Sequence, residues 1–330
     1  NQREGITQPE GAERLFHCTQ LMVATCFDTA RLAGVGASYE YYLEWKDTCP
    51  VPLRQVAADL GVEQPSGQQM LVAGMLRPAH LLDIVRNFIL FKQDSGRTVK
   101  IVPRYQQYRA VHKAIERITH GQTRRQLALS GVEGHGEADQ RGGIIWHTQG
   151  SGKSFTMVFL VRKMRTLPEL RRFKVVAVTD RIDLEDQLAD TATLTGEPLE
   201  RAESVADLQK LLRQPGAGLV FGMIQKAQTR DIAPAKEDIP PFPLLNESEE
   251  ILLLMDEAHR SHTSTLHANL MAALPNCAKI GFTGTPIIEA DKKPTHDIFG
   301  PFIDVYTIRQ SQQDGATVLA ANNLPSLHPL

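Results

Sequence analysis

From residue 143 onward the chain alternates short, fully apolar runs with longer segments of helical periodicity. Short apolar runs without polar alternation are typical of strands that are buried on both faces of a sheet. These runs cover residues 143–146, 174–179, 218–223, 251–255 and 278–283. The helical segments between them cover residues 154–166, 183–190, 203–213 and 264–273. This alternation predicts an α/β domain with a parallel sheet and helices on both of its faces.

The first part of the chain follows a less regular pattern. Short apolar runs and turns in residues 1–60 suggest the edge of a domain whose core lies elsewhere. Pro78 opens a predicted amphipathic helix, and a second helix follows Pro103. The glycine-rich stretch 121–143 predicts a loop, and the proline-rich stretch 229–249 predicts a surface insertion. The expected apolar positions are Leu81, Leu82, Val85, Phe88 and Ile89 in the first helix and Val111, Ala114, Ile115 and Ile118 in the second.

The composition is that of an ordinary globular protein, with 42% hydrophobic and 22% charged residues among 330. The net charge of -2 gives no overall signature of a nucleic-acid binder, although Lys and Arg cluster in 104–125 and 162–174. The four cysteines form no CxxC pair, which favours a reduced, cytoplasmic protein. No apolar run approaches the ~20 residues that span a bilayer, so no membrane is expected as a partner. Asn1 in place of an initiating Met suggests a fragment or a processed chain.

The stretch "GIIWHTQGSGKSFTM", residues 143–157, predicts a phosphate-binding loop between a strand and a helix. Glycines allow backbone N–H groups to converge on anionic oxygens, and the helix dipole behind them favours the negative charge. Lys153 can reach the β- and γ-phosphates and Ser154 can hold Mg²⁺. The full phosphate-loop pattern would place glycine where this chain has His147. The loop residues around the phosphates are Gln149, Gly150, Ser151 and Gly152.

The stretch "ILLLMDEAHRS", residues 251–261, ends a buried strand in two acidic residues. In a parallel sheet the carboxyl ends of the strands line the ligand crevice. Asp256 is therefore expected to contact the Mg²⁺ ion and Glu257 to act as the general base toward water. Acidic residues also favour helix N-termini, which is the structural alternative. A base that activates water points to hydrolysis rather than to phosphoryl transfer onto a second substrate.

The Asp-Glu-Ala-His order resembles the DEAH box of superfamily 2 helicases and translocases. "GFTGTP", residues 281–286, resembles the third motif of these motors, which links the nucleotide site to the nucleic-acid path. In this resemblance His259 is the histidine of the box that bridges to the third motif. His259, His262 and His267 do not have the spacing of a closed zinc set, so no zinc site is expected.

Several further stretches resemble the motor subunit of type I restriction enzymes over residues 12–318. They are "LFHCTQLMVAT", "RPAHLLDIVRNFILF", "RYQQYRAV", "WHTQGSGKS", "VVAVTDRIDLEDQL" and "FGPFIDVYTIRQSQQDGATV". The resemblance implies that Gln107, rather than Gln106, contacts adenine. It implies that Thr283 and Thr285 belong to the coupling motif. It also implies that Arg181, Asp183, Gln225 and Lys226 lie near the DNA path, whereas the alternative for Arg181 and Lys226 is ordinary surface charge.

The resemblance also implies an organisation. Residues 1–60 would be the tail of a nuclease domain, 61–100 a connecting helical segment and 101–310 the first RecA-like ATPase motor domain. Residues 311–330 would begin the linker to a second motor domain. The family uses ATP and Mg²⁺ to pump double-stranded DNA before cleavage, and its partners are methyltransferase and specificity subunits in the cytoplasm. The nuclease residues would precede residue 1, and the arginine fingers would follow residue 318.

Two other functions stay open on the sequence alone. The chain could be another superfamily 2 motor, such as an RNA helicase, or a non-enzymatic remnant that binds nucleotide or its partner subunits. The family pattern stops after "DGATV", so we expect that the natural chain ends early or that this is a piece of a longer one. In either case the nucleotide cleft would have one wall only, and ATP turnover by this chain would be poor.

Overall fold

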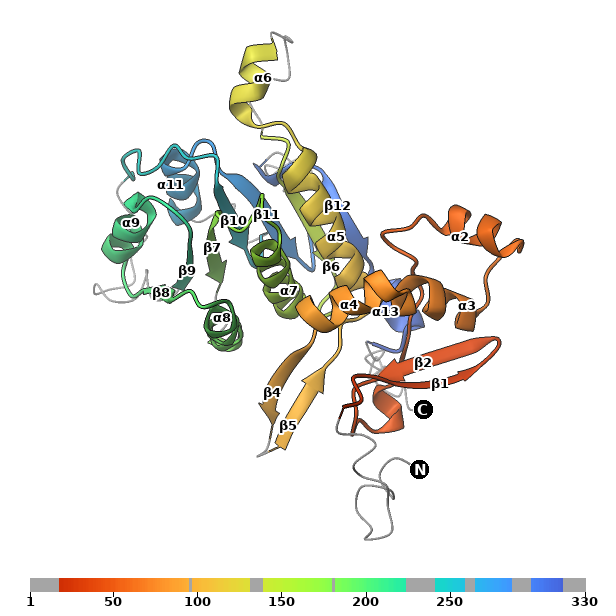
Figure 1. Ribbon diagram of the computed structural model, residues 1–330. Helices are drawn as coiled ribbons and strands as arrows, with labels where there is room; N and C mark the ends of the chain where they lie inside the picture. Colours follow the sequence, from red (N-terminus) through yellow and green to blue (C-terminus); the bar gives the residue numbers. More distant parts are fainter. Residues whose placement is uncertain are drawn as a thin grey trace, which may run out of the picture.

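The computed structural model describes residues 18–94, 97–130, 139–179, 182–223, 241–258, 265–286 and 298–316. Its centre is a seven-stranded sheet with the strand order β12-β6-β11-β10-β7-β9-β8 (Figure 1). Every neighbouring pair in this sheet is parallel. The strands are β6 (Gly143–His147), β7 (Lys174–Thr179), β8 (Leu199–Ala202), β9 (Gly218–Met223), β10 (Ile251–Met255), β11 (Ala278–Thr283) and β12 (Phe302–Tyr306).

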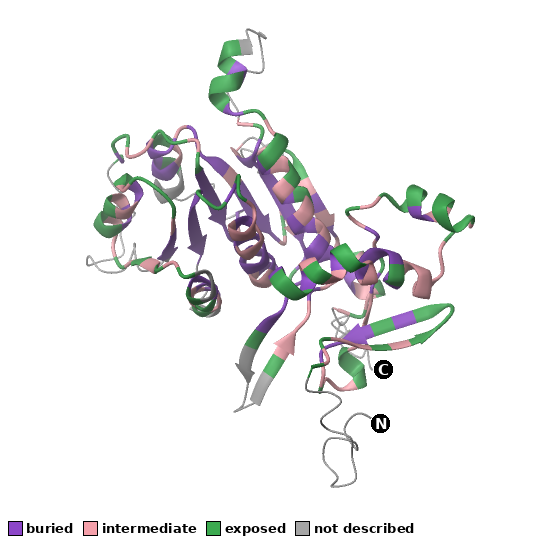
Figure 2. Cartoon of the chain, in the orientation of Figure 1, coloured by how far each residue is buried: buried purple, intermediate pink, exposed green. Residues whose placement is uncertain are grey.

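Both faces of this sheet are buried, because alternate residues of each strand enter two different hydrophobic clusters. Ile145 and Val175 join the cluster beneath α5 (Tyr105–His120), α7 (Lys153–Thr166) and α8 (Ile182–Thr195). Ile144 and Val176 join the cluster beneath α9 (Val205–Arg213) and α11 (Thr265–Ala273). Figure 2 shows the resulting band of buried residues through the sheet. The predicted α/β class, with a parallel sheet and helices on both faces, is confirmed.

The five strands predicted in this region are all present, and two further strands complete the sheet. β8 and β12 are the two edges, and their runs contain the charged residues Glu200, Arg201 and Asp304. Because of these charged residues, the two edge strands lack the fully apolar run that indicates a strand buried on both faces. The prediction of a loop for residues 121–143 was wrong in part, because α6 (Arg124–Ser130) lies within it.

The helix predicted after Pro78 is α4 (Pro78–Asn87), and its buried positions match the expected ones only in part. Phe88 and Ile89 are buried as expected, whereas Leu82 and Val85 are exposed and Ile84 is buried in their place. The chain leaves the helix before Leu90 and forms the antiparallel hairpin β4 (Leu90–Asp94) and β5 (Arg97–Ile101). The apolar run that suggested one long helix therefore belongs to a helix and a strand.

The N-terminal region packs directly against the central sheet's helices. It contains the antiparallel sheet β1 (Met22–Cys26), β2 (Thr29–Ala33) and β3 (Leu43–Glu44). The ring of Trp45 lies 5.7 Å from that of Tyr108 on α5. One hydrophobic cluster runs from Leu32 and Trp45 through α5 to the central sheet. The remaining elements are η2 (Tyr39–Tyr41), α2 (Leu53–Leu60), α3 (Gly67–Leu71), η3 (Val72–Leu76) and α13 (Ile308–Gln313).

Candidate nucleotide-binding site

The loop after β6 has the backbone geometry of a phosphate-binding loop. β6 ends at His147 and α7 begins at Lys153, so the intervening residues connect a central strand to a helix N-terminus. Gly150 and Gly152 have φ values of 76° and 81°, in the left-handed region that favours glycine. The Ser151 hydroxyl donates to the Thr148 carbonyl at 2.6 Å and ties the turn together. Backbone N–H groups at such a helix start form an anion-binding site.

Lys153 is largely buried at the base of this loop. Its side chain belongs to a residue that is only 4% exposed, and Nζ donates to the His147 carbonyl at 3.3 Å. A Cβ added to Gly284 would lie 3.4 Å from Nζ, so the loop after β11 also borders the ammonium. The position suits a lysine that binds phosphate oxygens, and Ser154 lies beside it on the first turn of α7.

The acidic pair lies at the carboxyl end of β10, two strands from the phosphate loop. Asp256 is buried, and its carboxylate accepts the Thr179 hydroxyl at 3.2 Å and the Glu257 backbone N–H at 2.9 Å. Glu257 has a φ of 48°, which is unusual for a residue with a side chain. Such strain costs on the order of 1–3 kcal/mol and concentrates at functional sites.

The third motif lies between the phosphate loop and the acidic pair, because β11 is the strand between β6 and β10. Thr283 is buried and pairs in register with Trp146. Its hydroxyl accepts the backbone N–H of Thr285 at 3.1 Å, and the Trp146 indole donates to the Gly284 carbonyl at 3.1 Å. The carboxyl ends of three adjacent strands therefore place the phosphate loop, the third motif and Asp256 side by side.

Gln107 contacts the phosphate loop directly. Its Nε2 donates to the Gly152 carbonyl at 3.0 Å, and its Oε1 accepts the Arg104 backbone N–H at 2.8 Å. A Cβ on Gly152 would lie 2.4 Å from Nε2, and the φ of 81° at this position also favours glycine. Gln107 also lines a cavity of about 1070 Å³ with Gly150, Gly152 and Phe155. The cavity is large enough for a nucleotide base and ribose, and the contact with adenine stays a prediction.

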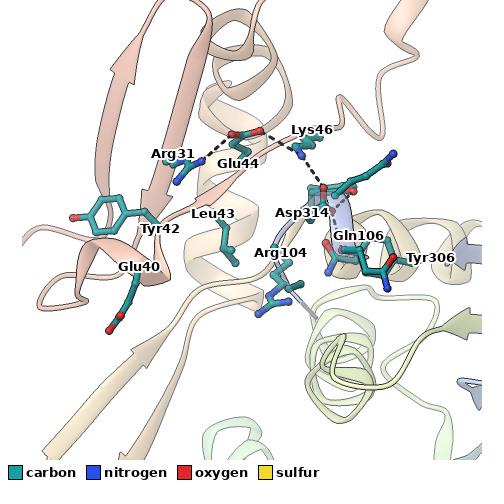
Figure 3. Close-up of a pocket in the computed structure, with 15 residues that line it drawn as sticks. Arg31, Glu40, Tyr42, Leu43, Glu44, Lys46, Arg104, Gln106, Tyr306 and Asp314 are labelled. Carbon is teal, nitrogen blue, oxygen red and sulfur yellow. Dashed lines mark hydrogen bonds and ion pairs between the residues drawn. The ribbon is translucent and has the colours of Figure 1, made fainter. Parts of the chain in front are cut away.

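Gln106, the less favoured adenine candidate, faces an adjoining cavity. This cavity of about 290 Å³ is also lined by Lys46 and Asp314, and it shares Arg104 with the larger one (Figure 3). Lys46 donates to Asp314 at 2.8 Å across this cavity, and the hydroxyls of Tyr105 and Tyr306 also donate to Asp314. The two adjacent glutamines thus face different cavities, and sequence periodicity alone does not predict which glutamine faces which cavity.

The structure adds residues that had no predicted role. The ring of His147, fully buried just before the loop, has its Nε2 2.9 Å from Oδ2 of Asp304 on β12. Burial lowers the pKa of His147, and Asp304 opposes this shift. The pKa of Asp304 lies well below its usual range, because hydrogen bonds from His147 and Arg109 outweigh the effect of its burial. The replaced glycine at 147 was the only signal in the sequence.

Other predicted residues lie outside the described part of the chain. These are Arg181, Gln225, Lys226, His259 and His262. Asp183 and His267 are described only as members of α8 and α11. Among the described residues no group of three or more His, Cys, Asp and Glu side chains could hold a metal ion. The oxygens of Ser154 and Asp256 are nevertheless the ligand type that Mg²⁺ takes together with substrate phosphates. No described helix has the length and apolar character required to cross a membrane.

The fold and the loop define an ATPase-type nucleotide-binding domain. A family model of SWI2/SNF2 ATPases matches residues 106–322, and the chain belongs to this family. It is also a homologue of the endonuclease subunits of type I restriction enzymes. The HindI endonuclease subunit of Haemophilus influenzae is 35% identical over 94% of this chain and 29% of its own length. The MjaIXP endonuclease subunit described in Methanocaldococcus jannaschii is 35% identical over 76% of this chain and 22% of its own.

A solved structure of an HsdR subunit fragment of a type I restriction enzyme from Vibrio vulnificus also matches. It is 16% identical, covers 87% of this chain and 50% of its own, and superposes with a TM-score of 0.39. The chain spans less than a third of the length of the HindI and MjaIXP relatives.

Proposed function

We propose that the chain is the first ATPase lobe of a DNA-translocating motor subunit in a type I restriction enzyme. The observation that carries this proposal is the convergence of Lys153, Asp256 and Thr283 at the adjacent carboxyl ends of β6, β10 and β11. The relatives are named as restriction endonuclease subunits, which supports double-stranded DNA as the substrate of the whole protein. Methyltransferase and specificity subunits are its proposed partners, in the cytoplasm.

Each site residue has a distinct role in this proposal. The backbone of residues 149–152 and the ammonium of Lys153 bind the phosphates, and Gln107 holds the loop beside the adenine cavity. Ser154 and Asp256 would hold Mg²⁺, which neutralises charge on the phosphates when it is bound. Glu257 accepts a proton from the attacking water. Thr283 and Thr285 connect this site to the DNA path, together with Arg181, Asp183, Gln225, Lys226 and His259.

ATP binding by the chain in the presence of Mg²⁺ tests this proposal. We expect weak binding that Lys153→Ala lowers at least about tenfold, because charged hydrogen bonds contribute about 1.5–3 kcal/mol. Lys210→Ala is the matched control, since Lys210 is exposed on α9, away from the loop. Equal binding by the wild-type chain and Lys153→Ala would contradict the phosphate-loop assignment.

Phosphate release with added double-stranded DNA tests the need for a second lobe. We expect little hydrolysis, because a motor of this kind closes its nucleotide cleft with residues from a second domain. Fast, DNA-stimulated hydrolysis by this chain alone would show that one lobe suffices. In the longer protein, stimulation by single-stranded RNA instead of double-stranded DNA would indicate an RNA helicase. If neither this chain nor the longer protein bound nucleotide, the non-enzymatic function would be the one that remains.

A further inference from the structure

A buried carboxylate on the edge strand β12 collects hydrogen bonds from two other elements. Asp304 accepts from Nε and Nη2 of Arg109 at 2.8 and 2.9 Å and from Nζ of Lys113 at 2.8 Å, both on α5. Its Oδ2 also lies 2.9 Å from Nε2 of His147 at the end of β6. The Asp304 side chain is 1% exposed, so these donors replace its hydration. Removing one of them would leave a partly compensated charge in the interior.

The ring of His147 depends on Asp304 for its polar anchoring. Burial favours the neutral imidazole, in which a proton on Nε2 is donated to Asp304. Nδ1 has no hydrogen-bond partner among the described residues, so Asp304 alone fixes the ring through hydrogen bonding. The backbone carbonyl of the same residue accepts Nζ of Lys153 at 3.3 Å. His147 therefore contacts Asp304 through its ring and Lys153, the residue proposed to bind the phosphates, through its backbone.

The other end of this cluster lies in the N-terminal region. Nη1 of Arg109 donates to Oδ2 of Asp47 at 2.8 Å, so a single guanidinium joins Asp47 to Asp304. The guanidinium is planar, and binding two carboxylates at once fixes its position. The neighbour of Asp47, Lys46, binds Asp314 near the end of α13 (Figure 3). The N-terminal region thus contacts the motor through two consecutive charged residues.

We propose that Asp47 is a positioning residue for the phosphate loop and acts on nucleotide affinity through Arg109, Asp304 and His147. This rests on the proposed function, since it concerns the same nucleotide site. Docking of the N-terminal region holds Arg109 against Asp304, Asp304 holds the His147 ring, and the His147 carbonyl sets the resting position of the Lys153 ammonium. Loss of the Asp47 carboxylate frees one side of Arg109 and loosens this series of contacts.

The first test is ATP affinity of the 330-residue chain with Asp47→Asn, measured well below its unfolding temperature. We expect a roughly two- to thirtyfold loss, the range found for residues that modulate a distant site. Asp59→Asn is the matched control, because Asp59 is a half-exposed acid of the same region that pairs with Arg77 at 3.9 Å. His147→Gln should also weaken ATP binding. The variant with both Asp47→Asn and His147→Gln should show a smaller fold-loss of ATP affinity than the product of the two single fold-losses. Unchanged affinity for Asp47→Asn, or fully multiplicative losses, would overturn the proposal.

The second test does not require nucleotide. The ring nitrogens of His147, identified by comparison with His147→Gln, are observed by nuclear magnetic resonance in the wild-type chain, Asp47→Asn and Asp59→Asn. We expect their chemical shifts to change in Asp47→Asn and to stay in place in Asp59→Asn. Shifts that are identical in all three would overturn the proposal even if the wild-type chain bound no ATP. Failure of Lys153→Ala to affect binding, with a changed His147 ring in Asp47→Asn, would reject the proposed function alone.

Discussion

At the residue scale, two neighbouring glutamines show how local structure separates similar side chains. Gln107 completes the cap of α5 and donates to the phosphate loop at Gly152. Gln106, which is equally buried, borders another cavity, and its Nε2 has no partner among the described residues. The two side chains therefore differ in their expected effect on nucleotide binding.

Gln107→Ala should weaken ATP binding and lower the free energy of unfolding by about 1–2 kcal/mol. It removes the hydrogen bond to the loop and the hydrogen bond from the Arg104 backbone N–H at the start of α5 at the same time. Titration with a fluorescent ATP analogue and urea denaturation measure the two effects. Gln106→Ala serves as the control and should keep the wild-type affinity. If both variants bound nucleotide equally well, Gln107 would have no role in holding the loop.

The motifs predict which residues form the candidate site but not all of their contacts. Lys153 and Asp256 follow from a motif whose order fixes their place at the strand ends. His147 was visible only as a departure from that motif, because its partner Asp304 is distant in sequence. A pair of buried polar residues on neighbouring strands leaves no periodic signal in the sequence, so only the structure reveals the contact between His147 and Asp304.

At the element scale, the strength of the apolar signal decided which strands were predicted. β10 consists of five buried residues and was predicted with its bounds. β8 and β12 lie at the edges, where one side of the strand has no neighbour and charged residues are tolerated. In α4 the exposed Leu82 and Val85 were predicted to be buried, because the apolar residues continue into β4 and the combined run was interpreted as one helix.

Leu254→Ala in β10 should lower the free energy of unfolding by about 2–5 kcal/mol. Leu254 is fully buried in a strand with neighbours on both sides, so truncation leaves a cavity that the sheet cannot close. Leu82→Ala on α4 is the matched control, since this leucine is 68% exposed, and it should change stability by less than about 0.5 kcal/mol. Urea unfolding of both variants gives the comparison, and equal losses would place β10 outside the stable core.

At the scale of the whole molecule, buried carboxylates connect elements that are far apart in sequence. Asp83 of α4 accepts Lys163 of α7 at 2.5 Å and lies 3.0 Å from Nε2 of His112 on α5. Asp304 of β12 joins α5 to β6 in the same manner. The pKa of each carboxyl group lies well below its usual range, because these hydrogen bonds outweigh desolvation. Acid should therefore weaken the assembly of the helices on the sheet.

The sign of the pH dependence follows from these lowered pKa values. A carboxyl group whose pKa is lower in the folded state stabilises the protein above its unfolded pKa of about 4. That contribution is lost as the pH falls from about 4 toward the folded pKa. We therefore expect the unfolding temperature to fall steeply below about pH 4, as followed by circular dichroism. Asp83→Asn should be less stable at neutral pH and lose less stability on acidification, whereas Asp59→Asn should follow the wild-type curve. If the unfolding temperature of Asp83→Asn fell with pH as steeply as that of the wild-type chain, other carboxylates would cause the acid sensitivity.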